Sequence, residues 1–261
     1  MIVNRRNFFI FAGTFAAASM DLRAWPAQKK TVKPKSKKTV KSQPAGTPRE
    51  RELLGLLRPE LSGEGFNLRK PAADAFDAMR QAAKKEGILL YSVSSYRGFE
   101  HQMKIWNQKY KGLSQSGVPA HDIIWKILEY SSMPGSSRHH WGTDLDLIDD
   151  SSTRPADPLR AEYFAEGGIY HNLYQWLLLN APTYGFYEVY TNDPQRTGFA
   201  YEPWHWSFSE LSISFLKEYG EIDLLKHLRN SPMEGRQILT PEIIQRYKKD
   251  WGQGVNPALK G

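Results

Sequence analysis

The chain has 261 residues, of which 40% are hydrophobic and 13% aromatic, so it can bury a sizeable core. It contains no cysteine, which excludes disulfides and thiolate metal sites and leaves His, Asp and Glu as metal ligands. The first 48 residues carry ten Lys or Arg and one acid, whereas residues 49–261 carry 25 basic and 27 acidic side chains. The net charge of +7 therefore lies in an N-terminal tail, which argues against a nucleic-acid partner.

Residues 1–27 have the features of an export signal. Arg5 and Arg6 precede an apolar stretch that runs from Phe8 to Met20 and is rich in small residues. The order of the two arginines and the following phenylalanines resembles twin-arginine signals. The stretch is shorter than the about 20 residues of a membrane span, which favours a signal over a permanent anchor. We expect export to the periplasm or cell envelope.

Residues 28–48 predict a disordered linker. They include seven Lys together with Pro, Ser, Thr and Gly, and they offer almost nothing apolar to bury. Lysines that follow an export signal favour electrostatic contact with an anionic membrane or wall surface. The alternative is a solvated spacer without a partner.

Residues 49–261 are expected to form the folded domain. Apolar residues recur at helical spacing over 67–85, where Pro71 suits a first turn and Gly87 ends the helix. The partly alternating residues 88–94 predict a strand. The elements expected after these are helices at 99–110 and 122–130, a strand at 143–148, a helix at 170–180, strands at 185–190 and 201–208, and two or three helices from about 211. Strands interspersed with helices, without a repeating strand–helix unit, predict an α+β fold.

Three segments collect the polar residues that can carry chemistry: 94–102, 137–146 and 202–206. Together they hold histidines, aspartates and a glutamate. Two histidines and one carboxylate with a nearby glutamate are the usual inventory of a zinc enzyme.

In the second segment the spacing limits which side chains can meet. Asp144 and Asp146 share one face of a strand, and the turn at Gly142 lets a histidine approach from a loop. Strand alternation alone makes Asp144 as good a ligand as Asp146. The neighbours His139 and His140 are equally open alternatives.

In the third segment Glu202 and His205 are three residues apart and would face opposite sides of a regular strand. Pro203 argues against a helix here. A bulge or bend at Pro203 and Trp204 would bring both side chains toward one point.

The three segments resemble, in order, the arginine, S-x-H-x-x-G-x-x-x-D and E-x-x-H motifs of the D-alanyl-D-alanine metallopeptidases. These are the VanY-type D,D-carboxypeptidases of the lysostaphin and hedgehog superfamily. The resemblance covers about two-fifths of the chain. It implies that His139, Asp146 and His205 hold zinc. It also implies Glu202 as general base and Arg97 as the cation beside the scissile carbonyl.

Four further residues are candidates for contact with substrate. The resemblance implies Ser137, the opening serine of the second motif, and Gln102, which matches a recurrent position. Asp144 stands where many members have alanine, so it is a partner for a ligand histidine, a specificity residue, or only a polar strand end. Arg138 follows Ser137 and has no other assigned role, so it is the candidate cation for the terminal carboxylate that a carboxypeptidase must bind.

The expected architecture is a small antiparallel sheet that carries the zinc site, flanked by helices and followed by a helical C-terminal extension. The expected function is an exported zinc D,D-carboxypeptidase acting on peptidoglycan stem peptides. The alternatives are an endopeptidase that cuts another wall crosslink and a zinc-containing cell-wall binding module without catalysis. Glu202 and Arg97 argue against the binding module, because a structural metal needs neither.

Overall fold

The computed structural model describes residues 46–151 and 153–261, so the predicted export signal and nearly all of the predicted linker lie outside the described residues. Its first helix is α1 (Pro48–Leu53), which has only six residues and therefore shows no helical period in the sequence. The Thr47 hydroxyl accepts the backbone N–H of Glu50 at 3.1 Å, and the Glu50 carboxylate accepts the N–H of Thr47 at 3.2 Å. This reciprocal capping pair fixes where α1 begins.

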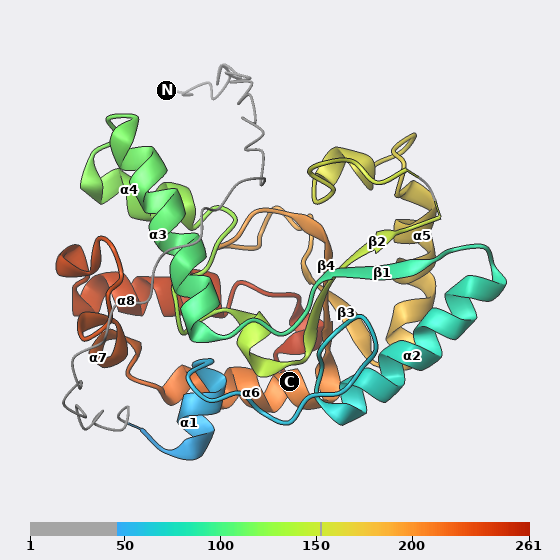
Figure 1. Cartoon of the computed structure of the whole chain (residues 1–261), viewed down its shortest axis with the longest axis horizontal. Coiled ribbons are helices and arrows are strands. Elements are labelled where there is room, and N and C mark those ends of the chain that lie inside the picture. The colour runs from blue at the N-terminus through green and yellow to red at the C-terminus, as the bar shows by residue number, and fades with distance from the viewer. Residues whose placement is uncertain (1–45, 152) are drawn as a thin grey trace, which may run out of the picture. The chain divides into compact units, whose positions relative to one another are not determined.

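Four strands form one antiparallel sheet in the order β1-β2-β4-β3 (Figure 1). They are β1 (Leu90–Ser94), β2 (Asp144–Asp149), β3 (Phe186–Tyr190) and β4 (Glu202–Phe208). Each lies within two residues of its predicted bounds. With the surrounding helices, this small sheet confirms the predicted α+β fold.

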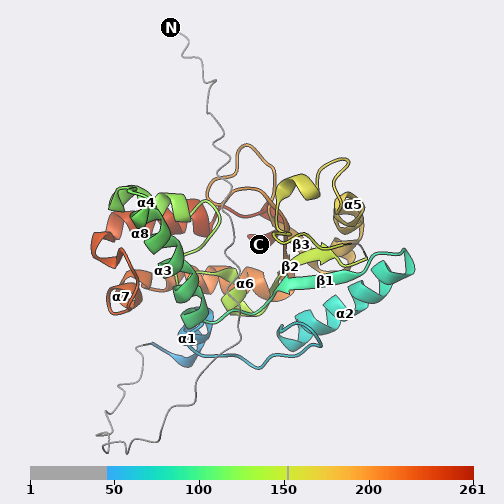
Figure 2. The same ribbon diagram turned by 45° about the horizontal axis from the view of Figure 1, so that its top comes forward.

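Helices α2 (Lys70–Lys85) and α5 (His171–Asn180) cover one face of the sheet (Figure 2). Helix α2 turns a stripe of apolar residues to the sheet, and Phe76 and Met79 on this stripe are almost fully buried. Leu145 and Leu147 of β2 join the same apolar core. This face of the sheet is therefore a conventional hydrophobic layer.

A second hydrophobic core involves five further helices, which gather on the left and lower side of Figure 1. These are α3 (Phe99–Gln115), α4 (Ala120–Ile127), α6 (Ser209–Glu221), α7 (Leu224–Arg229) and α8 (Pro241–Tyr247). Helix α3 extends five residues beyond its predicted end, and α4, with Pro119 at its N-cap position, begins two residues and ends three residues earlier than predicted. The predicted C-terminal helices are present as α6, α7 and α8.

The C-terminal helices reach the segment that precedes the second motif. The hydroxyl of Tyr247, at the end of α8, lies 2.6 Å from the Ser136 hydroxyl and accepts the N–H of Met133 at 3.4 Å. These bonds brace the turn that leads into residues 137–146. Within residues 46–151 and 153–261, no helix combines the length and apolar character that crossing a membrane requires.

Candidate zinc peptidase site

Strand β2 presents Asp144 and Asp146 on the face of the sheet that α2 and α5 leave free. In the register with β4, Asp144 lies opposite Ser207 and Asp146 opposite His205. Side chains alternate along a strand, so both carboxylates leave one face while Leu145 points to the other. Asp144 is fully buried and Asp146 is 6% exposed, so both carboxylates need polar partners.

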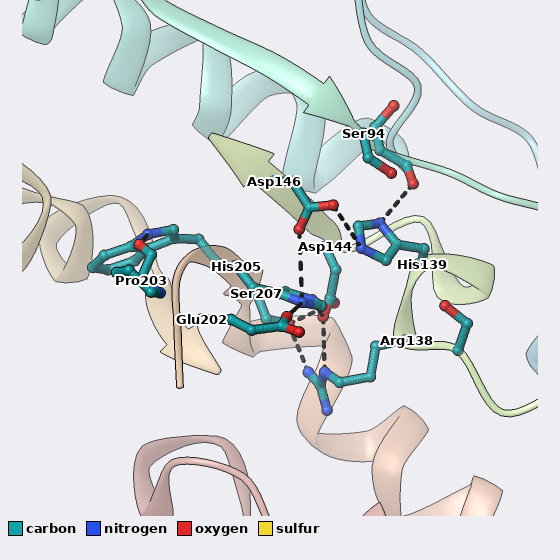
Figure 3. Close-up of polar contacts among 12 residues, drawn as sticks. Ser94, Arg138, His139, Asp144, Asp146, Glu202, Pro203, His205 and Ser207 are labelled. Carbon is teal, nitrogen blue, oxygen red and sulfur yellow. Dashed lines mark hydrogen bonds and ion pairs between the residues drawn. The ribbon is translucent and has the colours of Figure 1, made fainter. Parts of the chain in front are cut away.

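His139 approaches this face from a short 3-10 helix, η1 (Arg138–Trp141), rather than from the strand itself. The helix ends at Gly142, whose φ of 68° lies in the left-handed region that glycine adopts without strain. The Nδ1 atom of His139 donates to the carbonyl of Ser95 at 2.8 Å. This bond leaves Nε2 to face Asp146, with 3.4 Å between Nε2 and Oδ2 (Figure 3).

Strand β4 contains the bulge that the spacing of Glu202 and His205 predicts. Glu188 of β3 pairs with Trp206 and Tyr190 pairs with Glu202, so three residues of β4 lie opposite one residue of β3. The extra residues rotate Glu202 to the same side as His205. As a result the Glu202 carboxylate lies 3.2 Å from His205 Nδ1.

His205 is held by carboxylates at both ring nitrogens. Its Nε2 donates to Asp144 at 3.0 Å, while its Nδ1 lies 3.7 Å from Asp146 Oδ1. Burial disfavours the charged imidazole, but the bonds to Asp144 and Glu202 outweigh it and raise the pKa of His205 to about 9. The Tyr190 ring packs against the His205 imidazole in a T-shaped arrangement, with 5.0 Å between the ring centroids.

His139, Asp146 and His205 form the one cluster of three or more potential ligands in the described part of the chain. One ligand atom from each lies within 4.8 Å of the others. A tetrahedral zinc ion, with ligands at about 2.0–2.1 Å, holds its ligand atoms about 3.3 Å apart. Moreover, Asp146 Oδ1 is buried and has no hydrogen-bond partner among the described residues. The donor set therefore fits a zinc ion.

His140 points away from this cluster. Its Nδ1 donates to the carbonyl of Arg97, and its Nε2 accepts the N–H of Gly135 at 3.2 Å. Full burial is the main reason that its pKa falls to about 3, which keeps the imidazole neutral. His140 thus ties the first motif to the second through backbone groups, and of the two neighbouring histidines only His139 faces the aspartates.

A cleft of about 370 Å³ opens over the cluster. Arg97, Ser137 and Glu202 line it together with the three potential ligands. Burial raises the pKa of Glu202 despite its contact with His205. The Arg97 guanidinium donates to the Ser137 hydroxyl at 3.3 Å, and its buried Nε has no partner among the described residues.

Two of the predicted substrate contacts lie behind the cleft wall. Gln102 is fully buried, and its side-chain amide donates to the carbonyl of Ser132 at 2.7 Å and to the Ser131 hydroxyl at 3.3 Å. It therefore holds the segment that lines the cleft. Asp144 is also fully buried, and His205 lies between it and Asp146.

Arg138, predicted to bind the substrate carboxylate, lines the cleft but is already paired with an acid. Its Nε donates to Asp144 at 2.8 Å, and its guanidinium lies 4.6 Å from the ring centre of Trp141. The side chain is only 5% exposed. A buried guanidinium needs an acid beside it, and Asp144 supplies that acid. The sequence could not show the pairing, because the η1 helix folds Arg138 back toward the strand.

Two charged residues of the cleft were missed in the sequence. Lys109 on α3 and Asp157 in the loop after β2 line its walls. Lys109 follows Gln102 by seven residues, a spacing that places both on one side of a helix and could have identified it. Asp157 lies in an irregular loop, where no spacing rule applies.

Comparison with known proteins shows which family shares these motifs. The profile of the VanY family, described as D-alanyl-D-alanine carboxypeptidase, matches residues 65–211. The Bacillus subtilis protein YodJ is 34% identical over 139 residues, which are 53% of this chain and 45% of that protein. The D-alanyl-D-alanine carboxypeptidase of Enterococcus faecalis is 27% identical over 139 residues, or 52% of this chain and 44% of the relative. The chain thus matches less than half the length of either relative.

Solved structures of carboxypeptidases are also similar. VanYB in complex with D-alanine-D-alanine aligns with a TM-score of 0.48 and 23% identity over 66% of this chain and 89% of that one. The LdcB LD-carboxypeptidase aligns with a TM-score of 0.42 and 31% identity over 54% and 59% of the two chains. Because the family profile spans more than half of the sequence and all three motifs, the chain belongs to the VanY D-alanyl-D-alanine carboxypeptidase family.

Proposed function

We propose that this chain is an exported, zinc-dependent carboxypeptidase that removes the terminal D-alanine from peptidoglycan stem peptides. The observation that carries the proposal is the convergence of His139, Asp146, His205 and Glu202 at the floor of one cleft. Family membership supports peptide hydrolysis as the reaction class. A metal site with a purely structural role would not need an additional acid beside its ligands.

When bound, zinc supplies a Lewis acid and lowers the pKa of water at the site to about 7. His139 Nε2, the Asp146 carboxylate and His205 Nδ1 would hold the ion. Glu202 lies beside this set, and its raised pKa suits a group that accepts a proton from the attacking water and returns it to the leaving amine.

Arg97 is suited to stabilise the negative charge that develops on the scissile carbonyl oxygen. It lines the cleft, and its guanidinium forms only one hydrogen bond with the described residues, to the Ser137 hydroxyl. The backbone of Arg97 is anchored at the site, since its N–H donates to the His139 carbonyl at 3.1 Å. Preorganised donors of this kind contribute a few kcal/mol each to transition-state stabilisation.

Lys109 is our candidate for the terminal carboxylate of the substrate. Both Arg138 and Lys109 line the cleft, but Arg138 is paired with Asp144, whereas Lys109 forms no ion pair within the described residues. Partial burial lowers the pKa of Lys109, so an anion beside it would be favoured. The neighbouring hydroxyls of Ser131 and Ser132 offer further donors on the same wall.

The test is incubation of the full-length chain and zinc with a defined stem pentapeptide, followed by mass spectrometry. We expect release of single D-alanine, strongly reduced when the terminal carboxylate is amidated. Lys109→Met should raise KM for the free carboxylate and leave the amidated peptide unaffected, whereas Lys111→Met on the same helix is the matched control. Equal cleavage of the amidated peptide, or cleavage of crosslinked dimers alone, would establish the endopeptidase alternative.

Export is proposed on the strength of the N-terminal sequence. Arg5 and Arg6 with the apolar stretch after them support passage through a twin-arginine route. Replacement of both arginines by Lys should retain the protein inside the cell, as fractionation would measure. Deletion of the seven linker lysines should reduce salt-sensitive binding to isolated walls.

A further inference from the structure

Behind the cleft, a hydrogen-bond network surrounds the carboxylate of Asp144. Its Oδ2 accepts His205 Nε2 at 3.0 Å and Arg138 Nε at 2.8 Å. Its Oδ1 accepts the hydroxyls of Thr143 at 2.6 Å and Ser207 at 2.7 Å. A fully buried carboxylate with four donors is rigidly oriented.

Arg138 closes the network from the other side. Its Nη2 donates to the Ser207 hydroxyl at 2.7 Å, and that hydroxyl donates in turn to Asp144. The guanidinium is therefore fixed by two hydrogen bonds and by the face of Trp141. Figure 3 shows Arg138 and Ser207 converging on Asp144, away from Asp146. The cation offsets the cost of burying a carboxylate that no water can reach.

The two nitrogens of the His205 ring are not equivalent in this setting. A histidine that binds a metal is neutral and carries one ring proton, so only its other nitrogen has a lone pair for the metal. Asp144 can only accept at Nε2, so it keeps the proton there. The lone pair then belongs to Nδ1, the atom that faces Asp146 and Glu202.

We propose that Asp144, itself oriented by Arg138, is a positioning residue that fixes the His205 tautomer and ring angle for metal binding. Asp144 is not a ligand, since its Oδ2 contacts the nitrogen on the far side of the ring. This inference rests on the metal site proposed above. A carboxylate that orients a ligand histidine typically contributes about 10- to 100-fold in metal affinity.

Two substitutions of Asp144 change this network to different degrees. In Asp144→Asn, the amide oxygen can take the place of Oδ2 and accept from His205 and Arg138. The amide nitrogen then replaces Oδ1 and donates to the Thr143 and Ser207 hydroxyls. Asp144→Ala leaves His205 Nε2 and the Arg138 guanidinium without their acceptor.

We expect Asp144→Ala to raise the zinc dissociation constant of the full-length chain about 10- to 100-fold in chelator competition. Asp144→Asn should stay within a few-fold of wild type. Glu188→Gln is the matched control, because it removes a buried carboxyl from the same sheet without touching His205. The visible spectrum of the cobalt-loaded chain should change in Asp144→Ala and not in the control.

A wild-type measurement covers the case in which Asp144→Ala does not fold. Long-range proton–nitrogen NMR of the zinc-loaded chain should show His205 protonated at Nε2 and bound through Nδ1. Metal at Nε2, or an unchanged zinc dissociation constant in folded Asp144→Ala, would overturn the positioning role alone. A wild-type chain that binds no zinc would overturn the metal site and this inference together.

Discussion

The two faces of the sheet are buried to a similar degree but are built from opposite chemistry. The face that α2 and α5 cover presents apolar side chains such as Leu147 and Trp206. The cleft face presents Asp144, Asp146 and His205, of which none is more than 6% exposed. Neighbouring residues of β2 and β4 alternate between the two faces, so a single strand serves both. Polar residues at buried strand positions are therefore the mark of the functional face.

Two buried carboxyl groups, Asp144 and Glu188, show how neighbouring groups shift the pKa of a buried acid. Burial favours the neutral form of Asp144, but Arg138 and His205 outweigh it and hold the pKa of Asp144 well below its usual range. On the covered face, burial raises the pKa of Glu188 to about 7, because the Tyr174 hydroxyl, 3.3 Å from either oxygen, supplies too little opposition. The cleft face thus keeps its two aspartates charged by placing cationic groups beside them.

The largest effect is expected when a metal ligand on the cleft face is removed. His139→Ala, Asp146→Ala and His205→Ala should each reduce bound zinc from one ion per chain to near zero and abolish turnover, since three ligands are the minimum of a catalytic zinc site. Metal analysis after dialysis measures this. His140→Asn is the control and should keep its zinc. Full occupancy in all three alanine variants would place the metal elsewhere.

Next in size is the loss of the proposed general base. Glu202→Gln should keep zinc bound but lower kcat by about a hundredfold to ten-thousandfold, because an amide cannot accept the proton. Metal content and kcat measured on the same sample separate binding from chemistry. Near-normal turnover in Glu202→Gln would assign the base to another residue of the cleft.

Loss of the cation at the cleft is expected to have a slightly smaller effect. Arg97→Ala should retain zinc and lower kcat by about a hundredfold to a thousandfold, because donors to the carbonyl oxygen act chiefly in the transition state. Arg58→Ala, an exposed arginine outside the cleft, serves as the control. A rise in KM with unchanged kcat would show that Arg97 binds the substrate carboxylate instead.

The sequence predicted the elements well because most of them are long or strongly patterned. The stripe on α2 and the alternation of β2 reflect burial on one side, which residue order records directly. The bulge in β4 was predictable from Glu202, Pro203 and His205, since three-residue spacing and a proline do not suit a regular strand. Helix α1 was not predicted, because its start depends on a single capping pair.

The site was less predictable wherever contacts depend on the tertiary fold. Alternation left Asp144 and Asp146 equivalent, and only the pairing of β2 with β4 shows that one faces the cleft and the other lies behind His205. The bond from Arg138 to Ser207 joins residues far apart in the chain. The carbonyl of Ser95 that orients His139 is a backbone group and carries no residue signature.

The smallest expected effect on turnover comes from the covered face, where Glu188 affects stability alone. Its pKa of about 7 in the folded chain lies above the about 4.5 of an unfolded glutamate, so folding favours the protonated form. The stabilisation that the protonated Glu188 gives to the folded chain is complete below pH 4.5 and is lost as the pH rises through 7. Glu188→Gln cannot ionise and should remove this dependence.

Relative to wild type, the free energy of unfolding of Glu188→Gln should therefore increase by about 3 kcal/mol between pH 4.5 and pH 7. Denaturant titrations of both proteins at each pH measure the difference, in which the titration of the cleft residues cancels. Glu166→Gln, an exposed acid, should show no such change. A flat difference for Glu188→Gln would mean that Glu188 is already ionised in the folded chain, and that the covered face tolerates a charge much as the cleft face does.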